Sequence, residues 1–184
     1  LLAQPFGVVL QEMTLRRHPV TGFAHTLVDA LLDLGPVDTS RIAAVDAEVP
    51  SYVLDLTFPD EPQTADQAAW SLRYVAAAAL VGELPARRLR WPPDPATKKM
   101  RKKVYLTTRR AAPPDLAVSG QIRFADGASQ EFGRRVPHGH PDQPFSDSEL
   151  LQKAHRLGVL TPAEGKLALE KLRGWRGPIE AALF

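Results

Sequence analysis

Apolar residues recur every three or four positions along residues 23–34, which is the spacing of one face of an α-helix. Gly35 and Pro36 follow this pattern directly, and both residue types commonly end helices. Thr21 precedes it and is placed to cap the first turn with its hydroxyl. The pattern therefore predicts an amphipathic helix over residues 23–34 with Thr21 as its cap.

Residues 64–81 form a second helical pattern. Thr64 is a capping residue type, Asp66 places a negative charge in the first turn, and Gly82 follows the end. Four successive alanines occupy residues 76–79. Because small side chains let backbones approach closely, we expect another helix or a sheet to pack against this helix.

Four segments have the composition or the alternation of β-strands. Three single strands are predicted at residues 6–15, 42–49 and 104–108. Residues 116–136 alternate apolar and polar positions on both sides of Asp126–Gly127, a strong signal for a hairpin turn. We therefore expect two antiparallel strands joined at that turn.

The segments between these elements are rich in proline. A loop closed by Pro59 and Pro62 follows the second predicted strand. Residues 85–95 read as a proline-rich linker, residues 98–103 as a short basic helix, and residues 137–145 as a proline-broken loop.

Two capping boxes predict helices near the C-terminus. Ser146 is followed three residues later by Glu149, and Thr161 by Glu164. Strands with interposed helices and then a helical tail predict an α+β sandwich with a mainly antiparallel sheet. We expect one domain of residues 1–184, with an α+β core at 1–136 and a loop and helices at 137–184.

The composition is that of a globular protein, with 44% hydrophobic and 24% charged residues among 184. The sequence contains no cysteine, so any metal ligands would be histidine or carboxylate, and a reducing compartment is favoured. No apolar run approaches the roughly 20 residues that cross a bilayer, and no signal peptide is visible. A cytoplasmic protein without a membrane partner is expected. Because the chain opens on Leu1, a piece of a longer polypeptide is also expected.

Positive charge is concentrated in one segment. Residues 87–110 contain ten Lys or Arg and one acidic residue, Asp94, although the net charge of the whole chain is only +2. This segment, which overlaps the proline-rich basic segment at residues 85–103, is interpreted first as a solvated linker and helix. Attraction of acidic small molecules is a second interpretation. Binding of nucleic acid is disfavoured because few aromatic residues accompany the charges.

Four motifs in a fixed order resemble the C-terminal domain of the MmgE/PrpD family, which includes 2-methylcitrate dehydratase, cis-aconitate decarboxylase and an iminodisuccinate epimerase. They are LRRHPVTGFAH at residues 15–25, the alanine-rich SLRY helix at 62–80, IRFADG at 122–127 and GHPDQPFSDSELLQK at 139–153. Together they cover nearly all of the chain. No single motif is specific, whereas the four in this order and spacing are.

The resemblance implies the lid of a two-domain enzyme, in which a large all-helical N-terminal domain and this α+β domain enclose a polar cleft. That helical half is absent from the sequence, so we expect it in the same or another chain, within a homo- or hetero-oligomer. The implied activity is that of a cofactor-independent lyase or isomerase: a dehydratase, decarboxylase or epimerase. It would transfer a proton α to a carboxylate of a small di- or tricarboxylic acid.

The resemblance also implies site residues. His25 matches the family's motif histidine and is the candidate acid or base; the helix dipole at its first-turn position favours a neutral imidazole. Arg16 stands where relatives usually have lysine, and with Arg17 it is a candidate for binding substrate carboxylates, because guanidinium stays charged and binds carboxylates bidentately. The competing interpretation of Arg16 is an exposed arginine at a strand end, and that of His25 is a capping or packing residue. His18 replaces an aromatic residue and is expected to pack.

Ser71 and Tyr74 are three residues apart and would share a helix face. Tyr74 is the candidate donor to developing negative charge, with Ser71 as a substrate-binding residue; a core tyrosine with one hydrogen bond is the alternative. His138, His140 and Asp142 suggest a metal site only superficially, since a distant third ligand is missing, and loop packing is favoured.

Two other classes of function remain open. A non-catalytic assembly or regulatory subunit of the same family is favoured by Arg16 in place of lysine, whereas His25 and the SLRY motif favour an enzyme. A basic nucleic-acid-binding domain is the third and least favoured possibility.

Overall fold

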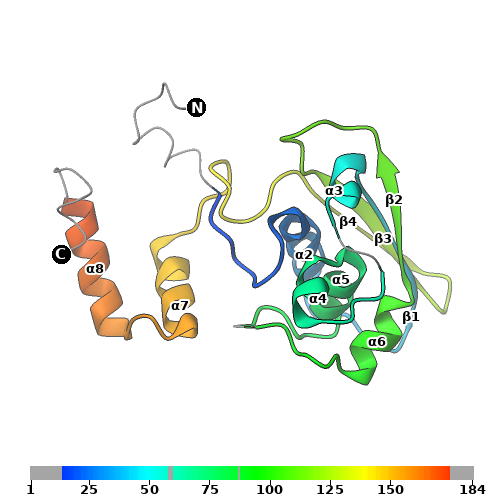
Figure 1. Cartoon of the computed structure of the whole chain (residues 1–184), viewed down its shortest axis with the longest axis horizontal. Coiled ribbons are helices and arrows are strands. Elements are labelled where there is room, and N and C mark those ends of the chain that lie inside the picture. The colour runs from blue at the N-terminus through cyan, green and yellow to red at the C-terminus, as the bar shows by residue number, and fades with distance from the viewer. Residues whose placement is uncertain (1–13, 58–59, 87, 175–184) are drawn as a thin grey trace. The chain divides into compact units, whose positions relative to one another are not determined.

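The computed structural model describes residues 14–57, 60–86 and 88–174 (Figure 1). The chain separates into two compact units, Leu1–Pro144 and Phe145–Phe184, and each is described by itself. We call them the α+β unit and the helical unit. The strand predicted at residues 6–15 lies outside the described residues except for Thr14 and Leu15, which are not part of a strand.

The α+β unit is built on a four-stranded mixed sheet in the order β2-β1-β3-β4. Its central strand β1 (Ile42–Pro50) pairs in parallel with β2 (Val104–Arg109) and antiparallel with β3 (Val118–Phe124). The hairpin of β3 and β4 (Ser129–Arg134) turns at Asp126–Gly127, as predicted, and Gly127 has a φ of 86°. The α+β fold class predicted from the sequence is confirmed.

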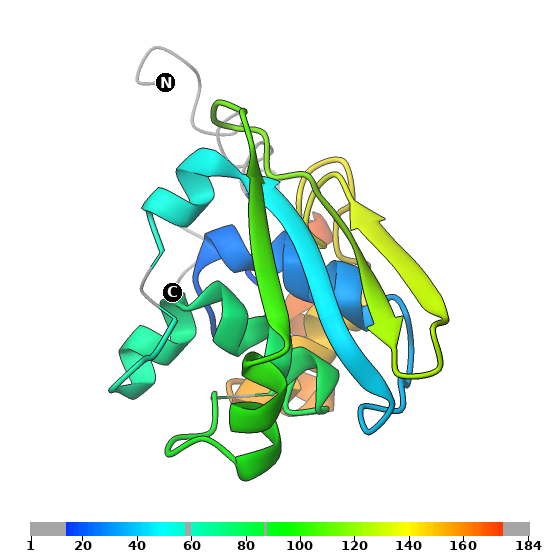
Figure 2. The same cartoon turned by 90° about the vertical axis from the view of Figure 1, so that its right-hand side faces the viewer.

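Helices cover one face of this sheet (Figures 1 and 2). Helix α2 (His25–Leu32) packs against β3 and β4, and α5 (Leu72–Leu80) packs against α2 and β2. Alanines 76–79 of α5 are at most 5% exposed, so the close packing predicted from their size is confirmed. The sheet contributes Ile42, Val45 and Ile122 to the same core.

One contact inside the sheet requires glycine. A Cβ atom on Gly120 in β3 would lie 2.2 Å from the Asp46 carbonyl oxygen and 2.5 Å from Cζ of Phe132. Phe132 can therefore pack over β3 only because residue 120 has no side chain.

Helix α2 begins differently from the prediction. A 3₁₀ turn, η1 (Gly22–Ala24), precedes it, and the Thr21 side chain makes no capping hydrogen bond. Instead, the Thr21 carbonyl oxygen accepts a hydrogen bond from the ring of His25. The expected Thr21 cap is wrong because this turn is closed by a side-chain to backbone bond from within the helix.

The helix predicted at residues 64–81 is two helices. Thr64 caps α4 (Ala65–Trp70) by accepting the Gln67 N–H, as predicted. Ser71 then adopts extended backbone angles (φ −84°, ψ 112°), and its hydroxyl accepts the Tyr74 N–H at 3.3 Å. Ser71 therefore ends α4 and caps α5, because serine competes for backbone hydrogen bonds within helices.

Two short helices complete the α+β unit. The predicted loop after β1 contains α3 (Ser51–Asp55), which the sequence did not indicate. The predicted basic helix is α6 (Pro95–Arg101); it starts three residues earlier because Asp94 accepts the Ala96 N–H and Pro95 occupies the first turn. It leads directly into β2.

The helical unit consists of α7 (Asp147–Leu157) and α8 (Pro162–Gly174), which contact each other. Ser146 and Glu149 form the predicted capping box, and Thr161 and Glu164 exchange the equivalent hydrogen bonds before α8. Within the described part of the chain, no helix combines the length and apolar character needed to cross a membrane.

Candidate functional site

Three buried polar side chains, His18, His25 and Asp29, form a polar cluster around the beginning of α2. His25, the predicted acid or base, is 1% exposed. Its Nδ1 lies 2.9 Å from the Thr21 carbonyl oxygen, and its Nε2 lies 3.2 Å from the backbone nitrogen of His18. Because a carbonyl only accepts and an N–H only donates, His25 is the neutral imidazole with its proton on Nδ1.

Burial holds His25 in this neutral form. Desolvation is the largest effect and lowers the pKa of His25 below its ordinary value, and the nearby charges of His18 and Arg16 act in the same direction. The hydrogen bond to Thr21 and the charge of Asp29 oppose this effect without reversing it. The sequence also predicted a neutral imidazole, but from the helix dipole, whereas in the structure burial is the largest cause.

Asp29 is the centre of the cluster, and the sequence analysis did not select it. Its side chain is fully buried, with Oδ1 3.0 Å from His18 Nε2 and Oδ2 accepting the His138 N–H at 2.7 Å. Arg17 Nη1 lies 3.5 Å from Oδ1. The available signal was an acidic residue one helical turn after His25 in an otherwise apolar stripe, which requires a partner if that stripe is buried.

The partners of Asp29 keep it ionised. Burial alone raises the pKa of Asp29, but the hydrogen bonds from His18 and His138 and the charges of His18 and Arg17 together lower it below its usual value. The carboxylate therefore connects the segment before α2, α2 itself and the loop around His138.

The two predicted carboxylate-binding arginines lie beside this cluster. Arg17 is partly exposed, with 30% of its side chain accessible, and faces Asp29. Arg16 is exposed, and its guanidinium lies 4.0 Å from the position of a Cβ built on Gly22, so it lies near the η1 turn. The structure thus brings Arg16, Arg17 and His25 together at one end of α2.

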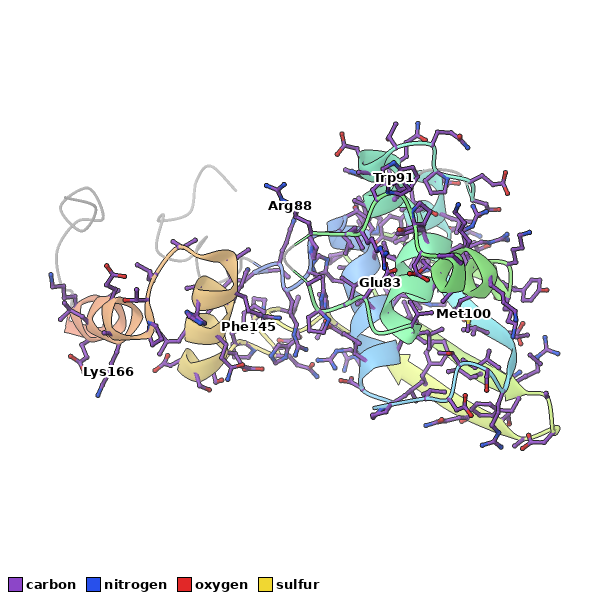
Figure 3. The ribbon with its side chains drawn as sticks, turned by 90° about the horizontal axis from the view of Figure 1, so that it is seen from below. Glu83, Arg88, Trp91, Met100, Phe145 and Lys166 are labelled. Atoms are coloured by element: carbon purple, nitrogen blue, oxygen red, sulfur yellow. The ribbon has the colours of Figure 1, made fainter. Side chains whose placement is uncertain are left out.

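Ser71 and Tyr74 occupy buried positions with local partners. Ser71 is 1% exposed and caps α5. The Tyr74 hydroxyl donates to the Arg90 carbonyl at 2.8 Å, and burial, aided by the charge of Glu83, raises the pKa of Tyr74 to about 12. Figure 3 shows Glu83 and Trp91 in this region. Among the described residues, no hydrogen bond joins Ser71 or Tyr74 to His25.

The loop with the two histidines contacts the segment before α2. Its Gly139 carbonyl accepts the Leu15 N–H at 2.9 Å, while His140 Nδ1 accepts the Asp142 N–H at 3.1 Å. Within the described ranges, no three His, Cys, Asp or Glu side chains are grouped so that they could hold a metal ion.

A mixed sheet covered on one face by helices, with two arginines beside a buried histidine, defines an α+β domain with a compact polar cluster. The family model of the MmgE/PrpD C-terminal domain matches residues 18–171, and the chain belongs to this family. The match contains His25, Asp29, Ser71 and Tyr74, whereas Arg16 and Arg17 precede it. Comparison with curated proteins finds no match.

Proposed function

We propose that the chain is the lid of a cofactor-independent lyase or isomerase acting on a small di- or tricarboxylic acid. The observation that carries this proposal is the position of Arg16, Arg17 and His25 at one end of α2, in a domain of the MmgE/PrpD family. Two guanidinium groups suit the carboxylates of such a substrate. A neutral imidazole suits removal of a proton α to one of them.

In the proposed reaction, Nε2 of His25 takes the α proton, because Nδ1 already carries one. The His18 N–H occupies that lone pair in the structure, so the backbone at His18 must move before His25 can act. Arg16 and Arg17 directly precede His18 in the same segment. Capture of substrate carboxylates by the arginines would thereby also release His25.

Tyr74 and Ser71 would act as hydrogen-bond donors. A pKa of about 12 keeps the Tyr74 hydroxyl protonated, and it would exchange the Arg90 carbonyl for a substrate oxygen that becomes negative in the reaction. Ser71 accepts a backbone N–H and retains its own hydroxyl hydrogen for a substrate carboxylate. The remaining acid/base groups would come from a helical half in the same or another chain.

A first prediction tests His25. In the domain assembled with its helical half, His25→Ala should lower turnover by roughly 10² to 10⁴, the usual contribution of a general acid or base. The measurement is the rate of water loss, carbon dioxide release or epimerisation across a panel of di- and tricarboxylic acids. His155→Ala is the matched control, because His155 is exposed on α7.

The outcome separates the proposal from a structural role. Activity that falls only in proportion to the melting temperature of each variant would assign His25 to packing. Absence of turnover by the wild-type assembly on every acid in the panel would refute the enzyme.

A non-catalytic assembly or regulatory subunit is the second candidate. Two points favour it: both ring nitrogens of His25 are engaged by backbone groups, and, by the resemblance drawn from the sequence, Arg16 stands where relatives usually have lysine. Such a subunit would bind its helical partner, and the assembly would turn over no acid of the panel. An assembly that forms but has no turnover therefore distinguishes the subunit from the enzyme.

A further inference from the structure

The basic segment contains two kinds of cation. Three of its arginines have acidic partners within the chain, at nitrogen to oxygen distances of 2.8 to 3.1 Å: Arg90 with Asp94, Arg101 with Glu61, and Arg109 with Asp115. The charges of these arginines are offset internally. They leave little net positive charge for a ligand.

The lysines of α6 and of the turn after it are different. No side-chain ion pair within the described residues involves Lys98, Lys99 or Lys102, and all three are exposed. Lys103 is half-buried, and its ammonium donates to the carbonyl of Ile42, which is uncharged. Lys98, Lys99, Lys102 and Lys103 therefore place four cations without an acidic partner among the described residues on and just after α6.

Two of these lysines line a small hollow. Its volume is about 140 Å³, and its walls are Thr39, Ser40, Val81, Ala96, Lys99, Met100 and Lys103. Residues 96, 99 and 100 lie on α6, and Figure 3 labels Met100 among them. Lys103 follows two residues after the helix ends and lines the same hollow, so two cations face an anion that enters it.

Asp38, the acidic residue next to the hollow in the sequence, does not pair with the lysines that line it. Asp38 Oδ1 accepts from the Ser40 N–H at 3.0 Å and from the Ser40 hydroxyl at 2.6 Å. These bonds and the charge of Arg41 lower the pKa of Asp38, but in the described part of the chain it forms no ion pair with Lys99 or Lys103. The Ser40 hydroxyl hydrogen is used, so the lysines and Thr39 are the donors that remain.

A groove of about 410 Å³ whose side chains are mainly apolar adjoins the hollow, and Thr39 and Val81 line both. Its other walls come from the ends of α2 and α5 and the segments that follow them, including Leu31, Pro36, Val37 and Leu80. A molecule with an anionic head and a small apolar body matches this pair of cavities.

We propose that the hollow binds the phosphate group of a small organic phosphate whose apolar part lies in the groove. Lysine is a compact point charge with three rotatable donors, and two such ammonium groups suit the negative charges and several oxygens of a phosphate. The hydrogen bond to Ile42 holds the Lys103 ammonium and leaves two donors for the ligand.

This site is separate from the cluster around His25. The groove lies at the Leu31–Leu32 end of α2, and His25 begins the helix, so the two are roughly 10 Å apart along its axis. The inference therefore does not depend on the proposed function.

Calorimetric titration of the 184-residue chain with phenyl phosphate and with inorganic phosphate, at about 0.15 M ionic strength, tests the site. Lys99→Gln and Lys103→Gln should each weaken binding by about tenfold or more, the effect of losing one charge-assisted hydrogen bond. Lys98→Gln is the control, since it removes the same charge from the same helix outside the hollow. It should weaken binding by about twofold or less.

Each result has a defined meaning. Tighter binding of phenyl phosphate than of inorganic phosphate supports the organic ligand, and equal binding overturns the part assigned to the groove. Equal losses in all three lysine variants, or no binding to the wild type, overturn the site. A thermal melt of each variant confirms that the fold is unchanged.

Discussion

Asp29 is the residue on which the polar cluster depends. Its two carboxylate oxygens accept from different donors, Oδ1 from His18 and Oδ2 from the His138 N–H. An asparagine at this position would turn one of these oxygens into an amide N–H₂ that faces a donor. Asp29→Asn should therefore lower the free energy of unfolding by about 3 kcal/mol, as for a broken buried ion pair.

Urea unfolding measures this loss. The matched control is Asp33→Asn, because Asp33 pairs with Arg134 but has 55% of its side chain exposed, and its loss should be about 1 kcal/mol or less. Similar losses in the two variants would contradict the central role of Asp29.

His25 predicts a dependence of stability on pH. Its pKa is lowered in the folded protein, so the unfolded chain binds a proton more readily as the pH falls below about 6.5. Stability from this residue is thus present above that pH and is lost progressively below it. Asp29, whose pKa is also lowered, adds a loss at more acidic pH.

Histidine NMR checks this prediction. As the pH falls through about 6.5, where a histidine in an unfolded chain takes up a proton, the His25 ring should still show the Nδ1–H tautomer, because its pKa is lowered. Protonation of His25 at or above that pH would show that the buried arrangement does not hold in solution.

At the scale of elements, one hydroxyl joins α5 to the proline-rich segment. Tyr74 donates to the Arg90 carbonyl, and its ring lies 6.3 Å from that of Trp91. Tyr74→Phe keeps the ring and removes the hydrogen bond, so it should lower the free energy of unfolding by about 1 kcal/mol. The tryptophan fluorescence, to which Trp91 contributes with Trp70 and Trp175, should also report a looser segment.

Tyr52→Phe is the control for this prediction. Its hydroxyl also donates to a backbone carbonyl, that of Asp115, at 2.7 Å. It should leave the surroundings of Trp91 unchanged. A Tyr74→Phe variant of wild-type stability would show that the segment is held by packing alone.

The elements recognised from the sequence are those with local signals. The hairpin at Asp126–Gly127 and the cap at Ser146 each depend on residues only a few positions apart, so the sequence displays them directly. The break at Ser71 was missed because serine is tolerated in helices as well as at caps. Packing of α5 against α2 and β2 decides whether Ser71 continues one helix or divides it into two.

At the scale of the whole molecule, we propose that the chain associates through α4 and the C-terminal helices. Residues 72–79 of α5 are buried within the α+β unit apart from the half-buried Arg73, so of the region 64–81 it is α4 that offers a surface, with Trp70 39% exposed. On the C-terminal helices and the turn between them, Leu157, Val159 and Leu167 are 38%, 68% and 54% exposed. We expect another chain or copy to cover the apolar residues that gather on the C-terminal helices, because grouped exposed apolar side chains mark contacts whereas isolated ones do not.

Sedimentation at micromolar concentration tests this association. Leu167→Glu should shift the chain toward the monomer, whereas Tyr105→Glu, on the exposed face of β2, should not. A wild-type chain that sediments as a monomer, both alone and with its helical half, would refute the association.

The sequence by itself determined the α+β class, most helices and strands, and the family, because hydrophobic periodicity, caps and turns are written in neighbouring residues. It also placed the arginines and His25 near one another, since they lie close together in the chain. Only the tertiary structure decided what those groups can do. Asp29 receives the N–H of His138 from 109 positions away, and the parallel pairing of β1 with β2 joins strands between which α3, α4, α5 and α6 intervene. Burial and the hydrogen bond from His138 across that separation set the charge of Asp29. The tautomer of His25 follows from the nearby backbone groups of Thr21 and His18, whereas the burial that favours its neutral form comes from the tertiary structure and is encoded by no local pattern.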